Sequence, residues 1–121
     1  MSECQREKEH ACALERAIAC MPTEEGIEAM SGAFKAMSEP SRLKILLALT
    51  QGELCVYHLV QAVGGTQSAV SHQLRILREG KIIRARRDGQ NVVYSLADGH
   101  VAQLLQTAYE HLSCKGGEED A

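Results

Sequence analysis

The sequence has few aromatic residues and few prolines, and it lacks any long hydrophobic run. Its 121 residues include no Trp, one Phe, three Tyr and two Pro, so aliphatic side chains must build a single modest core that dimerisation would enlarge. No apolar stretch is long enough to span a bilayer, and the first residues lack a secretory apolar segment. We therefore expect a cytoplasmic protein of one main domain without a membrane partner.

The number of cysteines and the distribution of charge further limit the functional classes to which the protein can belong. Five cysteines is an odd number, and in a reducing compartment they are expected to be thiols or metal ligands, not a disulfide framework. The net charge is −3, but residues 71–91 carry six cations and two anions, a local balance of +4. A basic centre of this kind suits contact with nucleic-acid phosphates. Charge alone fits a solvated hairpin equally well.

Hydrophobic spacing and turn residues predict a mainly helical chain with one small β-hairpin. The expected helices cover 24–37, 41–50, 56–63, 67–79 and 98 to about 113, and the expected strands cover 82–87 and 92–96. Part of the segment before Pro22 also has helical spacing. Asp88-Gly89-Gln90 marks the turn between the strands. The helix over 41–50 is apolar on most sides, so we expect it at the centre of the core.

Residues 56–79 have the pattern of a helix-turn-helix. Gly64-Gly65 makes a tight turn, and Thr66 can cap the helix that follows. One side of that helix carries Val70, Leu74 and Leu77. With the basic hairpin behind it, this arrangement predicts a winged helix-turn-helix that binds double-stranded DNA. The side chains expected at base edges or along the backbone are Gln67, Ser68, Ser71, His72, Arg75, Arg86, Arg87, Gln90 and Asn91. An ordinary amphipathic helix with a solvated polar side is the alternative.

Four segments occur together and in order: 38–50 (SEPSRLKILLALT), 53–59 (ELCVYHL), 68–74 (SAVSHQL), and Asp98-Gly99-His100 followed by His111. Through them the chain, from about residue 34 to 112, resembles the ArsR/SmtB family of metal-sensing transcriptional repressors, especially its zinc-sensing branch. The resemblance implies a homodimer held through its terminal helices, an inverted-repeat operator that overlaps a promoter, and metal-driven release. We expect no small organic substrate.

The C-terminal part offers a candidate metal site. Asp98, His100, His111 and Cys114 supply oxygen, nitrogen and sulfur donors that suit tetrahedral Zn(II). From Asp98 to His111 is roughly 20 Å along a helix that rises about 1.5 Å per residue, so one helix cannot bring both to one ion. Two antiparallel helices of a dimer can, with Asp98 and His100 from one chain and His111 and Cys114 from the other. In the resembled family this is the zinc-sensing site.

Each of these ligands also has an ordinary explanation. Asp98 can serve as a helix N-cap, and single histidines are usually surface residues. Cys114 stands where zinc sensors of the resembled family have Glu or His, and its thiolate would extend the response toward Cd(II).

A second candidate site begins with Cys55 and His58, three residues apart at the start of a helix. The resemblance implies that a Cys at this position joins ligands from the arm of the other subunit, for which the arm offers Cys4, His10, Cys12 and Cys20. Tyr57 replaces the second Cys of thiol-rich cadmium and lead sensors, and His58 stands where Asp is usual. A small, buried hydrophobic role for Cys55 is the alternative.

Three regions are expected: an arm with candidate metal ligands (1–22), a DNA-binding and dimerisation domain (23–114) and a flexible acidic tail (115–121). The predicted function is a repressor that leaves its operator on binding Zn(II), or Cd(II), and so derepresses metal efflux or sequestration genes. A thiol-based redox or persulfide sensor of the same fold, using Cys20 with Cys114 or Cys55, is the alternative.

An enzyme is not expected, because the sequence has no His-Glu-x-x-His pattern, no nucleophile with its base and no phosphate-binding glycine loop. A dimeric adaptor that binds only proteins is a further alternative, and it would shift no promoter fragment.

Overall fold

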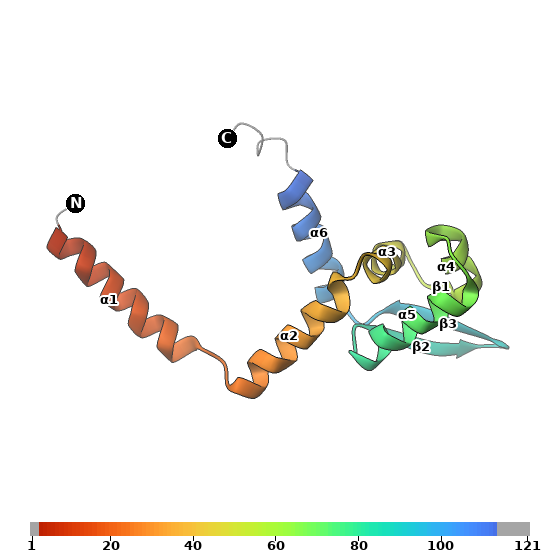
Figure 1. The fold of residues 1–121 in the computed structure, drawn as a ribbon, viewed down its shortest axis with the longest axis horizontal. Helices are drawn as coiled ribbons and strands as arrows, with labels where there is room; N and C mark the ends of the chain where they lie inside the picture. The colour runs from red at the N-terminus through yellow and green to blue at the C-terminus, as the bar shows by residue number, and fades with distance from the viewer. Residues whose placement is uncertain (1–2, 114–121) are drawn as a thin grey trace. The chain divides into compact units, whose positions relative to one another are not determined.

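The computed structural model describes residues 3–113, which form helices and short strands (Figure 1). In chain order the elements are α1 (Glu3–Cys20), α2 (Glu24–Ser38), α3 (Pro40–Leu49), β1 (Leu54–Cys55), α4 (Val56–Val63), α5 (Gln67–Glu79), β2 (Ile83–Asp88), β3 (Asn91–Leu96) and α6 (Gly99–Ser113). The predicted class, mainly helical with a small β-hairpin, is confirmed. The chain divides into two compact units, one ending at Ser31 and the other beginning at Gly32.

The first unit holds α1 and the start of α2. The arm is helical over nearly its whole length, more than the partial helix that the sequence indicated. Leu14, Ile18 and Met21, which share helical spacing, are 60%, 68% and 63% exposed. These side chains form an exposed apolar stripe along a segment that is otherwise rich in charged residues. None of the helices within residues 3–113 is both long and apolar enough to cross a membrane.

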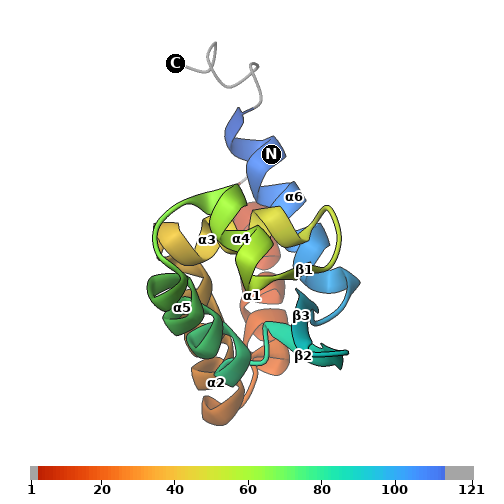
Figure 2. The same ribbon diagram turned by 90° about the vertical axis from the view of Figure 1, so that its right-hand side faces the viewer.

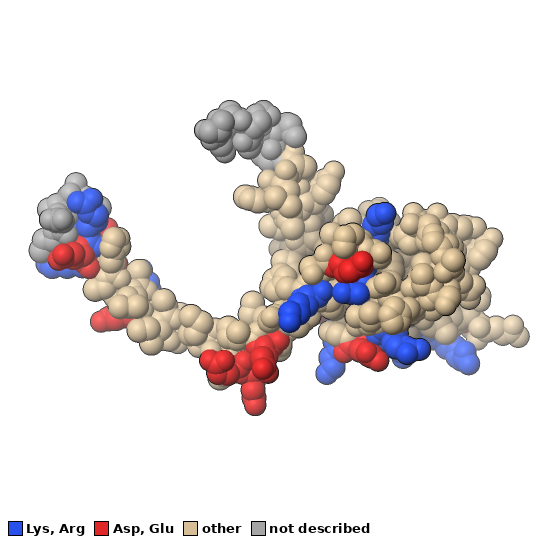
Figure 3. Space-filling model, in the orientation of Figure 1, with Lys and Arg blue, Asp and Glu red and all other residues tan. Residues whose placement is uncertain are grey.

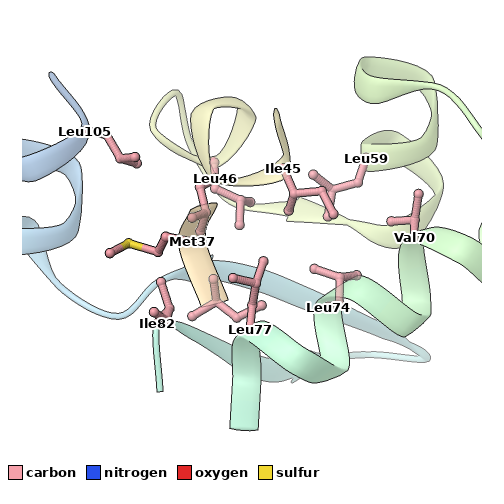
Figure 4. Close-up of a cluster of buried hydrophobic side chains, with 11 residues drawn as sticks. Met37, Ile45, Leu46, Leu59, Val70, Leu74, Leu77, Ile82 and Leu105 are labelled. Atoms are coloured by element: carbon pink, nitrogen blue, oxygen red, sulfur yellow. The ribbon is translucent and has the colours of Figure 1, made fainter. Parts of the chain in front are cut away.

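The second unit is built around one aliphatic core, in which Figure 4 shows side chains from several helices pointing toward one another. The buried residues are Met37, Ile45, Leu46, Leu49, Leu59, Val70, Leu74, Leu77, Ile82, Ile83 and Leu105. Ile45 and Leu46 of α3 are 1% and 0% exposed, so the predicted central place of this helix is confirmed. Arg42 of α3 donates to the Ala36 carbonyl (2.6 Å) and to the Gln73 side chain (2.9 Å), which ties α2 and α5 to α3.

The helix-turn-helix consists of α4, a glycine turn and α5 (Figure 2). Gly64 and Gly65 have φ values of +87° and +86°, a conformation that side chains other than glycine rarely adopt, so α4 ends here. The Thr66 hydroxyl then accepts the backbone N–H of Ala69 at 3.0 Å. This is the predicted N-cap. The buried side of α5 is the predicted one, with Val70, Leu74 and Leu77 at 4%, 1% and 0% exposure.

The predicted hairpin is present, with its strands one residue displaced from the expected ends. Asp88 pairs with Asn91, so it belongs to β2 and the turn contains only Gly89 and Gln90. Gly89 has a φ of +67°, which suits the first position of a two-residue hairpin turn.

A third strand, β1, was not predicted. Its two residues pair with β3, Leu54 opposite Tyr94 and Cys55 opposite Val93. A strand of two residues is too short to show alternating apolar and polar residues, so it can be recognised only from its pairing with β3. The strand fixes the start of α4 against the hairpin, because α4 begins at the residue after β1.

Candidate nucleic-acid interface and metal-ligand pairs

The polar side of α5 is exposed at every position predicted to contact DNA. These positions are Gln67, Ser68, Ser71, His72 and Arg75. The capped first turn and the buried opposite side hold the helix in place against the core. The helix therefore presents hydrogen-bond donors and acceptors of the kind that recognise base edges, on a supported scaffold.

Beside α5 lies a hollow of about 200 Å³, here called the arginine notch. It is lined by Ser71, Leu74, Arg75, Arg78 and Tyr94, from α5 and β3. Within residues 3–113 the structure gives neither Arg75 nor Arg78 an ion pair. Two guanidinium groups without a carboxylate, beside two side chains with hydroxyls, form a place that suits a phosphate group. The candidate DNA-contacting surface therefore extends from α5 toward β3.

The two arginines predicted on the wing have different surroundings. Arg86 donates from Nη2 to Oε1 of Glu53 at 2.5 Å and from Nε to Oε2 at 3.3 Å. This ion pair lowers the pKa of Glu53, mainly through the hydrogen bond from Arg86, and raises the pKa of Arg86. Arg87, on the opposite face of the strand, has no ion pair within residues 3–113. Of these two arginines, only Arg87 therefore carries an uncompensated charge.

Gln90 and Asn91 lie at the exposed end of the hairpin, as predicted. Figure 3 shows several Lys and Arg side chains projecting from the lower edge of the part that carries α5 and the strands, with acidic side chains between them. The basic surface that the local charge balance predicted is therefore present, although Glu53 neutralises one of its cations.

At the start of α6 the structure brings Asp98 and His100 together. Asp98 Oδ1 accepts the backbone N–H of His100 at 2.9 Å and lies 3.3 Å from its Nδ1. The backbone hydrogen bond is the main reason that the pKa of Asp98 is lowered. The His100 side chain is 92% exposed. Asp98 thus caps the helix, and its second oxygen and the imidazole form an accessible oxygen–nitrogen pair.

His111 lies on the same side of α6 as His100, eleven residues further on. Eleven residues make about three helical turns and span roughly 16 Å. The two imidazoles of one chain therefore cannot share an ion. Cys114 lies outside the described residues. Among residues 3–113, no three His, Cys, Asp or Glu side chains gather closely enough to hold a metal.

Cys55 and His58 form a second pair, with Sγ 3.3 Å from Nδ1. Cys55 is only partly buried, so it is not the enclosed hydrophobic residue of the alternative interpretation. Of the arm residues, His10, Cys12 and Cys20 are exposed on α1, and the Cys4 side chain is outside the described part. His10 and Cys12 point about 200° apart around the helix, so α1 presents only one of them to any one ion.

A family model described as "Bacterial regulatory protein, arsR family" matches residues 39–85, from α3 into β2. The transcriptional repressor SmtB homolog of Synechocystis is 49% identical over 83 residues, which cover 69% of this chain and 63% of that protein. The HTH-type transcriptional regulator NmtR of Mycobacterium tuberculosis is 49% identical over 82 residues, 68% of each chain. The chain belongs to the ArsR family. The family predicted from the four sequence segments is thereby confirmed.

The fold of this ArsR-family chain is also found in solved structures. The homodimeric winged helix-turn-helix DNA-binding domain of Mb0332 from Mycobacterium bovis matches with a TM-score of 0.67 and 30% identity, over 77% of this chain and 93% of that one. The predicted winged helix-turn-helix is therefore confirmed. These relatives are described as transcriptional regulators or DNA-binding domains.

In this ArsR-family chain, sequence reasoning missed three residues at the candidate interface. Arg78 could have been found, because it follows Arg75 by three positions on the same helix. Tyr94 and Glu53 could not, because their places depend on how β1, β2 and β3 pair across long stretches of chain.

Proposed function

We propose that this protein is a transcriptional repressor that binds operator DNA as a metal-free homodimer and leaves it on binding Zn(II). The supporting observation is the pair of half-sites on α6. Asp98 and His100 lie at its start, and His111 lies on the same side about three turns later. Each half offers too few ligands alone, and zinc prefers four. Two antiparallel copies of α6 would supply two equivalent complete sites.

In each such site, Asp98 and His100 of one chain would meet His111 and Cys114 of the second. The donor set fits zinc chemically, and the Cys114 thiolate would also accept Cd(II), a softer ion. We assign candidate metal ligands to the arm (1–22) and both DNA binding and dimerisation to the domain over 23–114, with residues 115–121 as an acidic tail. The second pair, Cys55 and His58, would need ligands from the arm of the other chain.

DNA and metal then favour different arrangements of the dimer. The free dimer would hold its two α5 helices one DNA turn apart. Metal at α6 would stabilise a dimer in which that spacing no longer fits. Linkage requires DNA to weaken metal binding by the same factor. Changing the bound fraction from nearly all to nearly none needs about 5 kcal/mol of coupling. The genes released would serve metal efflux or sequestration.

A zinc titration of the protein–operator complex tests the proposal. Wild-type protein is expected to leave the operator at stoichiometric zinc, and the His100→Ala/His111→Ala variant is expected to stay bound. Gln103→Ala, on the exposed surface of the same helix, is the matched control and should respond as wild type. Release of the double variant at stoichiometric zinc would refute the proposed site.

The contact between Cys55 and His58 favours one alternative, a repressor that senses oxidants or persulfide. An imidazole beside a thiol is a common feature of reactive cysteines. In that case peroxide or persulfide would release the operator in the presence of a chelator, and Cys55→Ser would abolish the response. Insensitivity of the chelated complex to both reagents would remove this alternative.

A further inference from the structure

The ion pair between Glu53 and Arg86 joins two parts of the second unit that are 33 residues apart in sequence. Two guanidinium nitrogens donate to the two carboxylate oxygens, at 2.5 and 3.3 Å. β1 makes this possible. Cys55 pairs with Val93, and Val93 pairs with Arg86, so the three form one row across the sheet. Glu53, two residues before Cys55, is thereby held beside the wing.

Stability is not the main effect of this pair. The side chains of Arg86 and Glu53 are 56% and 45% exposed. Exposed ion pairs contribute little to the free energy of unfolding, because water and salt screen them. The effect on charge is larger, since the carboxylate cancels one of the six cations between residues 71 and 91.

We propose that Glu53 withholds Arg86 from the DNA backbone and thereby limits sequence-independent binding. This inference rests on the proposed binding of DNA. Carboxylates and phosphates compete for the same fork of guanidinium N–H groups. If Arg86 turned to a phosphate, it would leave Glu53 unpaired beside a polyanion. Arg87, which has no ion pair within residues 3–113, meets no such competition. Glu53 is thus a positioning residue that acts through Arg86.

The test compares Glu53→Gln with wild type on an operator fragment and on an unrelated duplex of equal length, over a series of salt concentrations. Gln removes the charge and keeps nearly the same shape. We expect one additional phosphate contact, so the slope of log affinity against log salt should steepen by about 0.9. Between about 50 and 200 mM salt the variant should lose roughly threefold more affinity than wild type. The affinity for both duplexes should increase by the same factor, because phosphate contacts carry no sequence information.

Three further variants locate the effect. When Arg86 is already replaced by Gln, adding Glu53→Gln should neither increase the affinity for DNA nor steepen the slope of log affinity against log salt. Glu53→Asp, which keeps the charge, should restore the wild-type slope. Arg87→Gln should make the slope shallower by about 0.9, since it removes a contact. Thermal unfolding of each variant checks that the fold is intact.

Three results would overturn the proposal about Glu53. They are weaker binding by the Glu53→Gln variant, a gain in affinity that persists without Arg86, and no change in affinity or slope. In each case wild type still binds the operator, so only the role of Glu53 fails. If wild type binds neither duplex in metal-free buffer, the proposed repressor function fails instead.

Discussion

Asp98 caps α6, because its carboxylate accepts the backbone N–H of His100 in the first turn of the helix. This hydrogen bond favours the ionised form and lowers the pKa of Asp98. A carboxyl with a lower pKa in the folded state stabilises that state above the unfolded pKa. The contribution is lost as the pH falls through the folded pKa.

We therefore expect an NMR titration of the Asp98 carboxyl to have its midpoint below the ordinary value of 3.8. The His100 amide should lose protection from exchange over the same pH range. Asp98→Asn is the control, because it keeps an oxygen acceptor but does not titrate. A midpoint at or above the ordinary value would contradict the cap seen in the structure.

A second prediction for a single residue concerns the role of Arg78 in DNA binding. Arg78 lines the arginine notch without an ion pair in residues 3–113, so a backbone phosphate is its expected partner. Arg78→Gln should weaken binding to operator and unrelated duplex alike and make the salt slope shallower by about 0.9. Lys8→Gln, on α1, removes the same charge outside the notch and should leave the slope unchanged. An equal change in both variants would mean that only net charge matters.

At the scale of the element, α5 could be predicted almost completely from the sequence. Its cap, its buried side and its polar side all follow from residues within a few positions of one another. The wing could be predicted only in part. The turn at Gly89 is a local signal, but the pairing of β1 with β3 joins residues far apart in sequence. Tyr94 and Glu53 reach the candidate interface through that pairing, so no local pattern identifies them.

The first turn of α5 gives a prediction about stability. Thr66→Ala removes the hydroxyl that accepts the Ala69 N–H, and it should lower the free energy of unfolding by about 1 kcal/mol. Thr66→Ser keeps the hydroxyl and should be close to wild type. Urea unfolding of the three proteins measures the difference. Equal stability of the Ala and Ser variants would show that the cap is not used in solution.

For the whole molecule, the main feature is how much apolar surface the terminal helices leave uncovered. Leu104, Tyr109 and Leu112 of α6 are 41%, 66% and 81% exposed, and Leu14 and Ile18 of α1 are more than half exposed. Soluble monomers rarely expose so many large apolar side chains on their helices. A dimer through these helices, as proposed, would cover them. The sequence indicated helical spacing only in the segment before Pro22, since spacing is local, whereas which surfaces meet depends on a second chain.

Mixing two inactive variants tests whether zinc is shared between chains. Homodimers of His100→Ala or of His111→Ala each lack one ligand in both sites. A mixed dimer with antiparallel helices has one complete site, and its other site lacks both histidines. We expect each homodimer to bind zinc much more weakly than wild type. Losing a residue that only supports a ligand lowers metal affinity roughly 10- to 100-fold, and losing a ligand itself should lower it further. The mixture, unfolded and refolded together, should recover tight binding.

The controls for this experiment are the two variants refolded separately and wild type refolded in the same way. Recovery of tight binding only after joint refolding supports sharing across the dimer. If the mixture recovers nothing while wild type binds zinc, the ion is held within one polypeptide.

The spacing of His100 and His111 along α6 has a consequence for how such a protein can change over generations. Inserting or deleting one codon between them would rotate His111 by about 100° around the helix. Both histidines would survive in the gene, yet they would no longer face the same neighbour. If the two histidines bind zinc as proposed, the length of this segment matters as much as its chemistry, and small in-frame indels there should be as harmful as losing a histidine outright.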